Sequence, residues 1–169
     1  MPQDIPFSAQ FEHLIHQLVD HHVEFVLIGG WAAIVHGSAR STVDVDVVYR
    51  RTSDNIKRLV AALGPIHPYL RGAPAGLPFF WDERTIQAGL NFTLVTDLGP
   101  IDTLADVGAG ITYEYLLRNS IEETIVNRSI RIASLDAIVH MKRIAARDKD
   151  KEDIEILEAI RAEKGGLQE

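Results

Sequence analysis

The stretch Val43-Asp44-Val45-Asp46-Val47-Val48 follows Leu27-Ile28-Gly29-Gly30 at a short interval, and this combination decides the fold. In it valine alternates with aspartate at a period of two, which is typical of a β-strand. The period places Asp44 and Asp46 on one face, about 6.5 Å apart along the backbone, and Val43, Val45 and Val47 on the other. Two such carboxylates repel each other and resist burial, but a divalent cation between them would relieve the repulsion. The stretch is therefore a candidate catalytic metal site.

Length and composition limit the fold and the location. The chain has 169 residues, 46% of them hydrophobic, so we expect a single domain spanning residues 1–169. No apolar run reaches the roughly 18 residues of a membrane helix and the start is not signal-like, so we expect a cytoplasmic protein with no membrane partner. The absence of cysteine excludes disulfides and thiolate zinc sites. The formal charge of −7 argues against a wholly nucleic-acid-binding surface, but a local basic patch stays open.

Hydrophobic periodicity predicts alternating strands and helices around this stretch. The apolar run from Val23 to Ile28 ends in the Gly-Gly pair and is typical of a buried strand entering a tight turn. Residues 65–82 are rich in proline and glycine and predict a long loop. The other expected elements are helices after Ser8, at 31–36, from Ser53 to Leu63, at 113–118, 135–147 and 152–162, and strands at 90–96, 101–104, 124–126 and 130–133. We therefore expect an α/β (α+β) fold, a small mixed sheet flanked by helices, with a C-terminal helical tail at about 134–164.

Gly29-Gly30, thirteen intervening residues and Asp44-Val45-Asp46 together resemble the signature of the nucleotidyltransferase superfamily related to DNA polymerase β. That signature is a small pair, a short helix and Asp-x-Asp on a strand. Arg40-Ser41-Thr42, just before the acidic pair, is similar to the form in the minimal, abortive-infection toxin-related group. Lys142 followed by Arg-Asp-Lys-Asp-Lys-Glu-Asp at 147–153 resembles another motif of that group. The resemblance implies a nucleotidyltransferase-type sheet.

The resemblance also implies metal-dependent transfer of a nucleoside monophosphate from an NTP to an acceptor hydroxyl, with two Mg²⁺ ions as cofactors. Asp44 and Asp46 would hold the metal. Related enzymes need a third acid on a neighbouring strand, and Asp102 is our candidate because it lies in a strand-like segment directly after a turn. It would complete the metal site and help to activate the hydroxyl. Asp97 and Asp106 suit this role less well, since one lies in the predicted turn and the other beyond the strand.

By the same resemblance, Gly29, Gly30, Arg40, Thr42 and Lys142 would bind the nucleotide. The two glycines would let backbone N–H groups approach the triphosphate without an intervening Cβ. Many relatives carry serine where this chain has Gly30, so a side-chain hydroxyl contact is lost here. Lys142 also falls in the middle of the apolar face of a predicted helix, where it must reach solvent, pair with a carboxylate or meet a phosphate.

The acceptor and the partners stay open. The toxin-related resemblance implies an RNA acceptor, for instance a tRNA end, in a toxin–antitoxin setting with an antitoxin protein as partner. The Gly-Gly-Trp opening at 29–31 and the compact length are similar to small lincosamide-modifying enzymes, so nucleotidylation of an antibiotic, a lincosamide or an aminoglycoside, is the alternative. A non-catalytic member that binds a nucleotide or a protein is a further alternative.

Overall fold

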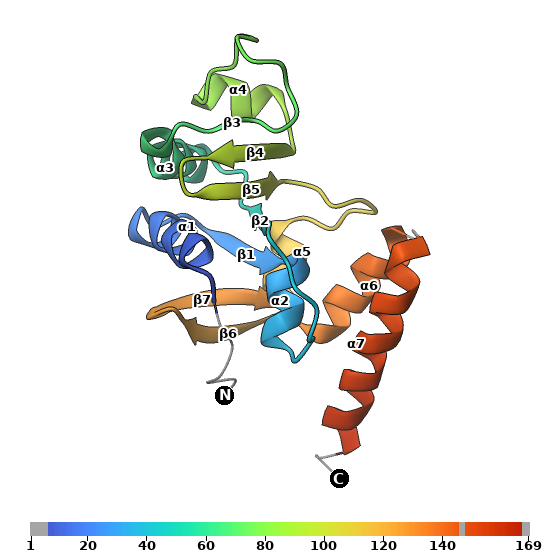
Figure 1. Ribbon diagram of the computed structural model, residues 1–169. Coiled ribbons are helices and arrows are strands. Elements are labelled where there is room, and N and C mark those ends of the chain that lie inside the picture. Colours follow the sequence, from blue (N-terminus) through green and yellow to red (C-terminus); the bar gives the residue numbers. More distant parts are fainter. Residues whose placement is uncertain (1–6, 146–147, 167–169) are drawn as a thin grey trace.

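The computed structural model describes residues 7–145 and 148–166, as a mixed sheet with helices around it (Figure 1). The strands are β1 (Phe25–Ile28), β2 (Val45–Tyr49), β3 (Tyr69–Leu70), β4 (Phe92–Thr96), β5 (Gly99–Leu104), β6 (Ser120–Ile125) and β7 (Arg128–Ala133). The helices are α1 (Ala9–Asp20), α2 (Gly29–Val35), α3 (Ser53–Leu63), the 3₁₀ turn η1 (Gly64–Ile66), α4 (Glu83–Ala88), α5 (Tyr113–Arg118), α6 (Leu135–Ala145) and α7 (Asp148–Gly166).

In the described part of the chain, seven strands form one sheet in the order β3-β4-β5-β2-β1-β7-β6. The pairs β1–β7 and β2–β5 are parallel, whereas β1–β2, β3–β4, β4–β5 and β6–β7 are antiparallel. This confirms the expected α/β fold with a mixed sheet flanked by helices. The acidic strand β2 lies at its centre, between β1 and β5.

The core forms where apolar faces of helices meet the central strands. All four residues of β1 are buried, as a strand covered on both faces requires. Helix α1 begins where Ser8 Oγ accepts a hydrogen bond from the backbone N–H of Phe11, at 3.1 Å, and it buries its apolar stripe against α3 and the sheet. Helices α6 and α7 pack along each other beside α2 (Figure 1). This packing brings the C-terminal helices to the Gly-Gly turn.

The start of the acidic strand differs from the expectation. Strand β2 begins at Val45, so Asp44 precedes the strand, and Val43 is 71% exposed instead of lying on an inner face. The pairing with β1 ends at Asp46, opposite Ile28, where the chain turns into α2, and Val45 belongs to the strand through its pairing with Ile101 of β5. The prediction of a strand from Val43 is therefore wrong by two residues.

The region around the proline- and glycine-rich segment is more ordered than expected. The predicted loop 65–82 contains part of η1 and the short strand β3, which pairs with β4. Directly after it, α4 begins at Glu83, preceded by its N-cap Asp82, whose carboxylate accepts a hydrogen bond from the N–H of Thr85. The helical tail is present, although α7 starts at Asp148 and not at residue 152.

Within the residues that the structure describes, no helix is long and apolar enough to cross a membrane.

Candidate active site

The Gly-Gly turn brings the backbone of α2 against the acidic strand. Gly29 has a φ of +73°, a conformation that favours glycine. A Cβ at this position would lie 2.1 Å from Oδ2 of Asp46, so the carboxylate rests directly on the Gly29 backbone. Any side chain at residue 29 would displace Asp46, and the two residues therefore form one structural unit.

Gly30 meets Thr42 in the same way. A Cβ on Gly30 would lie 2.5 Å from Oγ1 and 2.6 Å from Cβ of Thr42. The Thr42 side chain thus fills the space that a residue-30 side chain would need. The structure brings together Gly30 and Thr42, two of the predicted nucleotide-binding residues, and supplies a hydroxyl beside the turn from another position in the chain.

The register of β2 and β5 brings the predicted acids together. Asp46 is the direct partner of Asp102 across this parallel pair, so their side chains share one face of the sheet. Asp44 lies just before β2. Asp97 lies in the turn between β4 and β5, where its carboxylate pairs with Nδ1 of His67 at 2.6 Å. It therefore does not belong to the group of Asp44, Asp46 and Asp102.

The electrostatic state of Asp46 reflects this crowding. Burial, the negative charge of Asp102, hydrogen bonding with Asp102 and the charge of Asp44 together raise the pKa of Asp46 to about 8. At neutral pH, a carboxyl with such a pKa mostly retains its proton. A divalent cation would supply positive charge that replaces this proton, and carboxylate oxygen is the ligand that hard cations prefer. The chemistry of the three acids therefore fits a divalent metal.

Arg71 is the residue that sequence reasoning missed. Its Nη2 lies 2.8 Å from Oδ1 of Asp102 and 2.9 Å from the carbonyl oxygen of Leu94, and its Nη1 lies 3.6 Å from Oδ2 of Asp44. The guanidinium thus links two of the three acids. The sequence contains no signal for this contact beyond a basic residue in a loop, because residues 71 and 102 meet only through the β3–β4–β5 pairing.

Among the described residues, no group of three or more histidine, aspartate or glutamate side chains converges on one point that could hold a metal ion. The guanidinium of Arg71 instead lies between the carboxylates of Asp44 and Asp102 and pairs with both.

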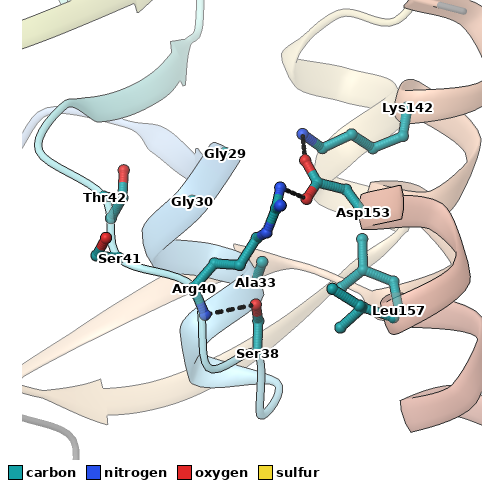
Figure 2. Close-up of a pocket in the computed structure, with 11 residues that line it drawn as sticks. Gly29, Gly30, Ala33, Ser38, Arg40, Ser41, Thr42, Lys142, Asp153 and Leu157 are labelled. Atoms are coloured by element: carbon teal, nitrogen blue, oxygen red, sulfur yellow. Dashed lines mark hydrogen bonds and ion pairs between the residues drawn. The ribbon is translucent and has the colours of Figure 1, made fainter. Parts of the chain in front are cut away.

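The predicted basic residues Arg40 and Lys142 both pair with acids of α7. Arg40 forms ion pairs with Asp153 and, at 3.1 Å, with Glu152. Lys142 Nζ lies 3.2 Å from Asp153 and 3.3 Å from the fully buried Asp150. Figure 2 shows Asp153 between the two cations. Of the three environments expected for Lys142, the structure has the carboxylate pair.

Arg147 lies outside the described residues, and so does the side chain of Lys149.

Two cavities meet at the Gly-Gly turn. The first has a volume of about 320 Å³ and lies between the turn, the segment 38–42 and α7 (Figure 2). The second, of about 440 Å³, contains the three acids on one side and an apolar wall on the other. Gly29, Gly30 and Lys142 line both of them. The apolar wall consists mainly of Leu104, Val107, Ile138 and Met141.

A family model described as "Nucleotidyltransferase of unknown function (DUF6036)" matches residues 9–104 of the chain. The chain belongs to this family. It is therefore a nucleotidyltransferase, and the match contains the Gly-Gly turn, the three acids and Arg71 but not Lys142.

Solved structures show that this nucleotidyltransferase shares its fold with antibiotic-modifying enzymes. The lincosamide antibiotic adenylyltransferase LnuA, in a lincomycin-bound crystal structure, is 15% identical with a TM-score of 0.61, over 91% of this chain and 98% of that one. The antibiotic-resistance factor ANT(2'')-Ia is 15% identical with a TM-score of 0.54, over 94% and 93%. A search of curated proteins by sequence found no significant match. These similarities confirm the nucleotidyltransferase-type fold expected from the sequence.

Proposed function

We propose that this nucleotidyltransferase uses Asp44, Asp46 and Asp102 to hold divalent metal, with two Mg²⁺ ions, and moves a nucleoside monophosphate from an NTP to an acceptor hydroxyl. The observation that carries the proposal is the pairing of Asp46 with Asp102 on adjacent parallel strands, against the backbone of Gly29. Bound Mg²⁺ would neutralise charge on the phosphates and on the departing pyrophosphate. In this arrangement the acids supply a hard-oxygen site.

Asp102 is suited to the proton transfer. Its side chain is 18% exposed and belongs to the second cavity, where an acceptor can reach it. In the proposed step the acceptor oxygen forms a bond to the α-phosphorus and the bond to the β-phosphate oxygen breaks. Pyrophosphate leaves, and the hydroxyl proton passes to Asp102. Asp46 is less accessible to an acceptor because its carboxylate lies against the backbone of Gly29.

The first cavity is the proposed triphosphate site. Backbone N–H groups of Gly29 and Gly30 and the hydroxyl of Thr42 lie at its wall, and Arg40 and Lys142 line it. Both basic side chains now pair with acids of α7, so phosphate oxygens would replace these carboxylates as their partners. Thr42 would supply the side-chain hydroxyl that Gly30 lacks.

We propose a small molecule as the acceptor. The second cavity, of about 440 Å³ with one apolar wall, falls in the size range of small-molecule sites, roughly 300–1,000 Å³. The formal net charge of −7 weakens the attraction of a polynucleotide to the chain as a whole. The fold shared with lincosamide and ANT(2'')-type resistance enzymes is consistent with an antibiotic-like acceptor.

RNA is the second candidate acceptor. It is favoured by the Arg40-Ser41-Thr42 segment and by the tail motif around Lys142, which resemble the toxin-related group. In that case the acceptor would be a tRNA or another RNA end, and an antitoxin protein would be the expected partner.

The first experiment measures NTP binding by isothermal titration, with and without Mg²⁺, and transfer from α-³²P-labelled NTPs. Wild type, Asp102→Asn and the control Asp97→Asn are compared, because Asp97 lies in the neighbouring turn outside the site. We expect metal-dependent binding by wild type and the control, and a loss of transfer of at least about a hundredfold in Asp102→Asn.

Two acceptor pools, total RNA and a panel of small polyhydroxyl compounds, then separate the candidates. Label on the small molecules supports the first proposal, and label on RNA supports the second. Tight NTP binding with no transfer to any acceptor would favour the non-catalytic alternative, and no NTP binding at all would refute the proposal.

A further inference from the structure

Arg71 occupies a position where a basic side chain competes with a metal ion. Its guanidinium contacts Asp102 at 2.8 Å and Asp44 at 3.6 Å, and these are two of the three acids proposed to hold Mg²⁺. A guanidinium and a metal ion both need the carboxylate oxygens, and two positive charges at one place repel each other. The two occupants of these carboxylates therefore exclude each other.

The backbone around Arg71 allows this side chain to leave without unfolding its surroundings. The N–H of Arg71 donates to the carbonyl oxygen of Thr93 at 2.9 Å, so the main chain is anchored next to β3 whatever the side chain does. The side chain is 31% exposed, on the wall of the acidic group, and needs only new χ angles to swing away. The exchange thus requires a rotamer change and not a movement of the sheet.

The guanidinium is incompletely paired where it now lies. Its Nε is buried and has no hydrogen-bond partner among the described residues. The contact with Asp44 is also long for a hydrogen bond, at 3.6 Å. Such a group gains by moving to an anion that can use its planar set of donors, and the phosphates of a nucleotide are of this kind.

We propose that Arg71 is the counter-cation of the metal-free site and that it is exchanged for metal when the nucleotide arrives. This inference rests on the proposed function and concerns how metal binding is regulated. A metal ion that binds alone must displace Arg71 from its carboxylate partners. When a triphosphate binds with the metal, its phosphates offer Arg71 a new anionic partner. Binding of metal and of nucleotide is then mutually reinforcing, since each favours the same position of Arg71.

The test measures Mn²⁺ binding, by the EPR signal of the free ion, in wild type and in Arg71→Gln. Without nucleotide, we expect Arg71→Gln to bind Mn²⁺ about tenfold more tightly than wild type, because the competing charge is gone. A non-hydrolysable NTP should raise the Mn²⁺ affinity of wild type several-fold more than that of Arg71→Gln. Arg84→Gln is the control, since Arg84 is exposed on the neighbouring α4.

Two results would overturn the inference. If Arg71→Gln binds Mn²⁺ with unchanged or lower affinity, while wild type binds it, Arg71 only positions Asp102 and does not compete with metal. If neither protein binds Mn²⁺, with or without the NTP, the metal-dependent function itself fails. Thermal unfolding without metal checks that the variant is folded.

A second measurement works on the native chain. The ¹⁵N–¹H signal of the Arg71 Nε, assigned by its loss in Arg71→Lys, should shift when Mg²⁺ and the NTP analogue are added together, and much less with Mg²⁺ alone. An unmoved signal in the metal- and nucleotide-bound protein would contradict the exchange even if Arg71→Gln does not fold.

Discussion

At the residue scale, the two glycines of the turn serve different contacts. Gly29 is required both by its φ of +73° and by the Asp46 carboxylate that lies against it. Gly30 is required by a neighbour, because Thr42 fills the space beside it. A serine side chain at position 30 would therefore collide with Thr42.

Gly30→Ser and Thr42→Gly should be energetically coupled. We expect Gly30→Ser alone to lower the free energy of unfolding by about 1–3 kcal/mol, because Thr42 Cβ belongs to the chain segment and cannot swing away. In the double variant Gly30→Ser/Thr42→Gly the total cost should be smaller than the sum of the single costs by at least about 1 kcal/mol. Urea unfolding of the four proteins measures this, and additive costs would refute the collision.

His36 should make stability fall in mild acid. It is buried and its Nε2–H donates to the carbonyl oxygen of Ala133 at 2.8 Å, and burial lowers its pKa below the ordinary value of 6.5. The unfolded chain therefore takes up this proton at a higher pH than the native protein does. The stability due to the neutral imidazole is complete above pH 6.5 and is lost as the pH falls toward the native pKa.

Unfolding free energies of wild type and His36→Gln between pH 8 and pH 5 test this. Below pH 6.5 the wild-type value should fall more steeply than that of the variant, by up to about 1.4 kcal/mol per pH unit. Parallel curves would show that His36 takes no part. The exposed His13 gives a matched control, His13→Gln, for which we expect the wild-type slope.

At the scale of elements, α7 is joined to the site by its acids. Lys142 on α6 pairs with Asp150 and Asp153 on α7, and Arg40 pairs with Asp153 from the segment before β2. This arrangement connects the C-terminal helices to the turn through charges, and α7 has no strongly amphipathic sequence of its own. The position of α7 therefore determines whether Arg40 and Lys142 in the first cavity are paired with carboxylates.

Asp150→Asn should lower the stability of the protein much more than removal of the exposed ion pair between Arg143 and Glu158 of α7. Asp150 is fully buried, so we expect Asp150→Asn to lower the free energy of unfolding by about 2–4 kcal/mol. Glu158→Gln removes the exposed partner of Arg143 and should cost less than about 1 kcal/mol. Differential scanning calorimetry compares the two, and equal costs would contradict a special role for Asp150.

At the scale of the whole molecule, the sheet and helix α6 line the second cavity together. The acids lie on β2, just before it and on β5, and the apolar wall comes from α6, from β5 and from Val107. Ala145, at the end of α6, lines this cavity and is exposed, so a larger side chain can enter it without disturbing the core. Access of an acceptor can thus be altered separately from nucleotide binding.

Ala145→Trp should obstruct binding of the acceptor and leave binding of the nucleotide unchanged. We expect transfer to fall about tenfold or more while NTP affinity changes less than about twofold, because Ala145 does not line the first cavity. Ile144→Trp is the control, since Ile144 is a neighbour outside this lining. Initial transfer rates and titration measure the two effects, and a parallel loss of NTP binding would place the acceptor elsewhere.

Much of the fold was predictable because it depends on local patterns. The apolar run of β1, the Gly-Gly turn, the alternation in β2 and the Ser8 cap of α1 are properties of short segments. Boundaries were less predictable, since they depend on partners: β2 pairs with β1 only from Asp46, opposite Ile28, and Val45 joins the strand through Ile101 of β5. The strand β3 and helix α4 were missed because proline and glycine nearby hide elements that only their packing stabilises.

By itself, the sequence determined the type of enzyme through the order and spacing of its glycines and acids, since a turn followed by an acidic strand is a local arrangement. Only the tertiary structure decided which groups face these acids. The β2–β5 register placed Asp102 opposite Asp46, the β3–β4–β5 pairing brought Arg71 to them, and the packing of α7 gave Lys142 its acidic partners. Such contacts join residues distant in the chain, and their energies depend on distance in space and on burial, which no spacing in the sequence records.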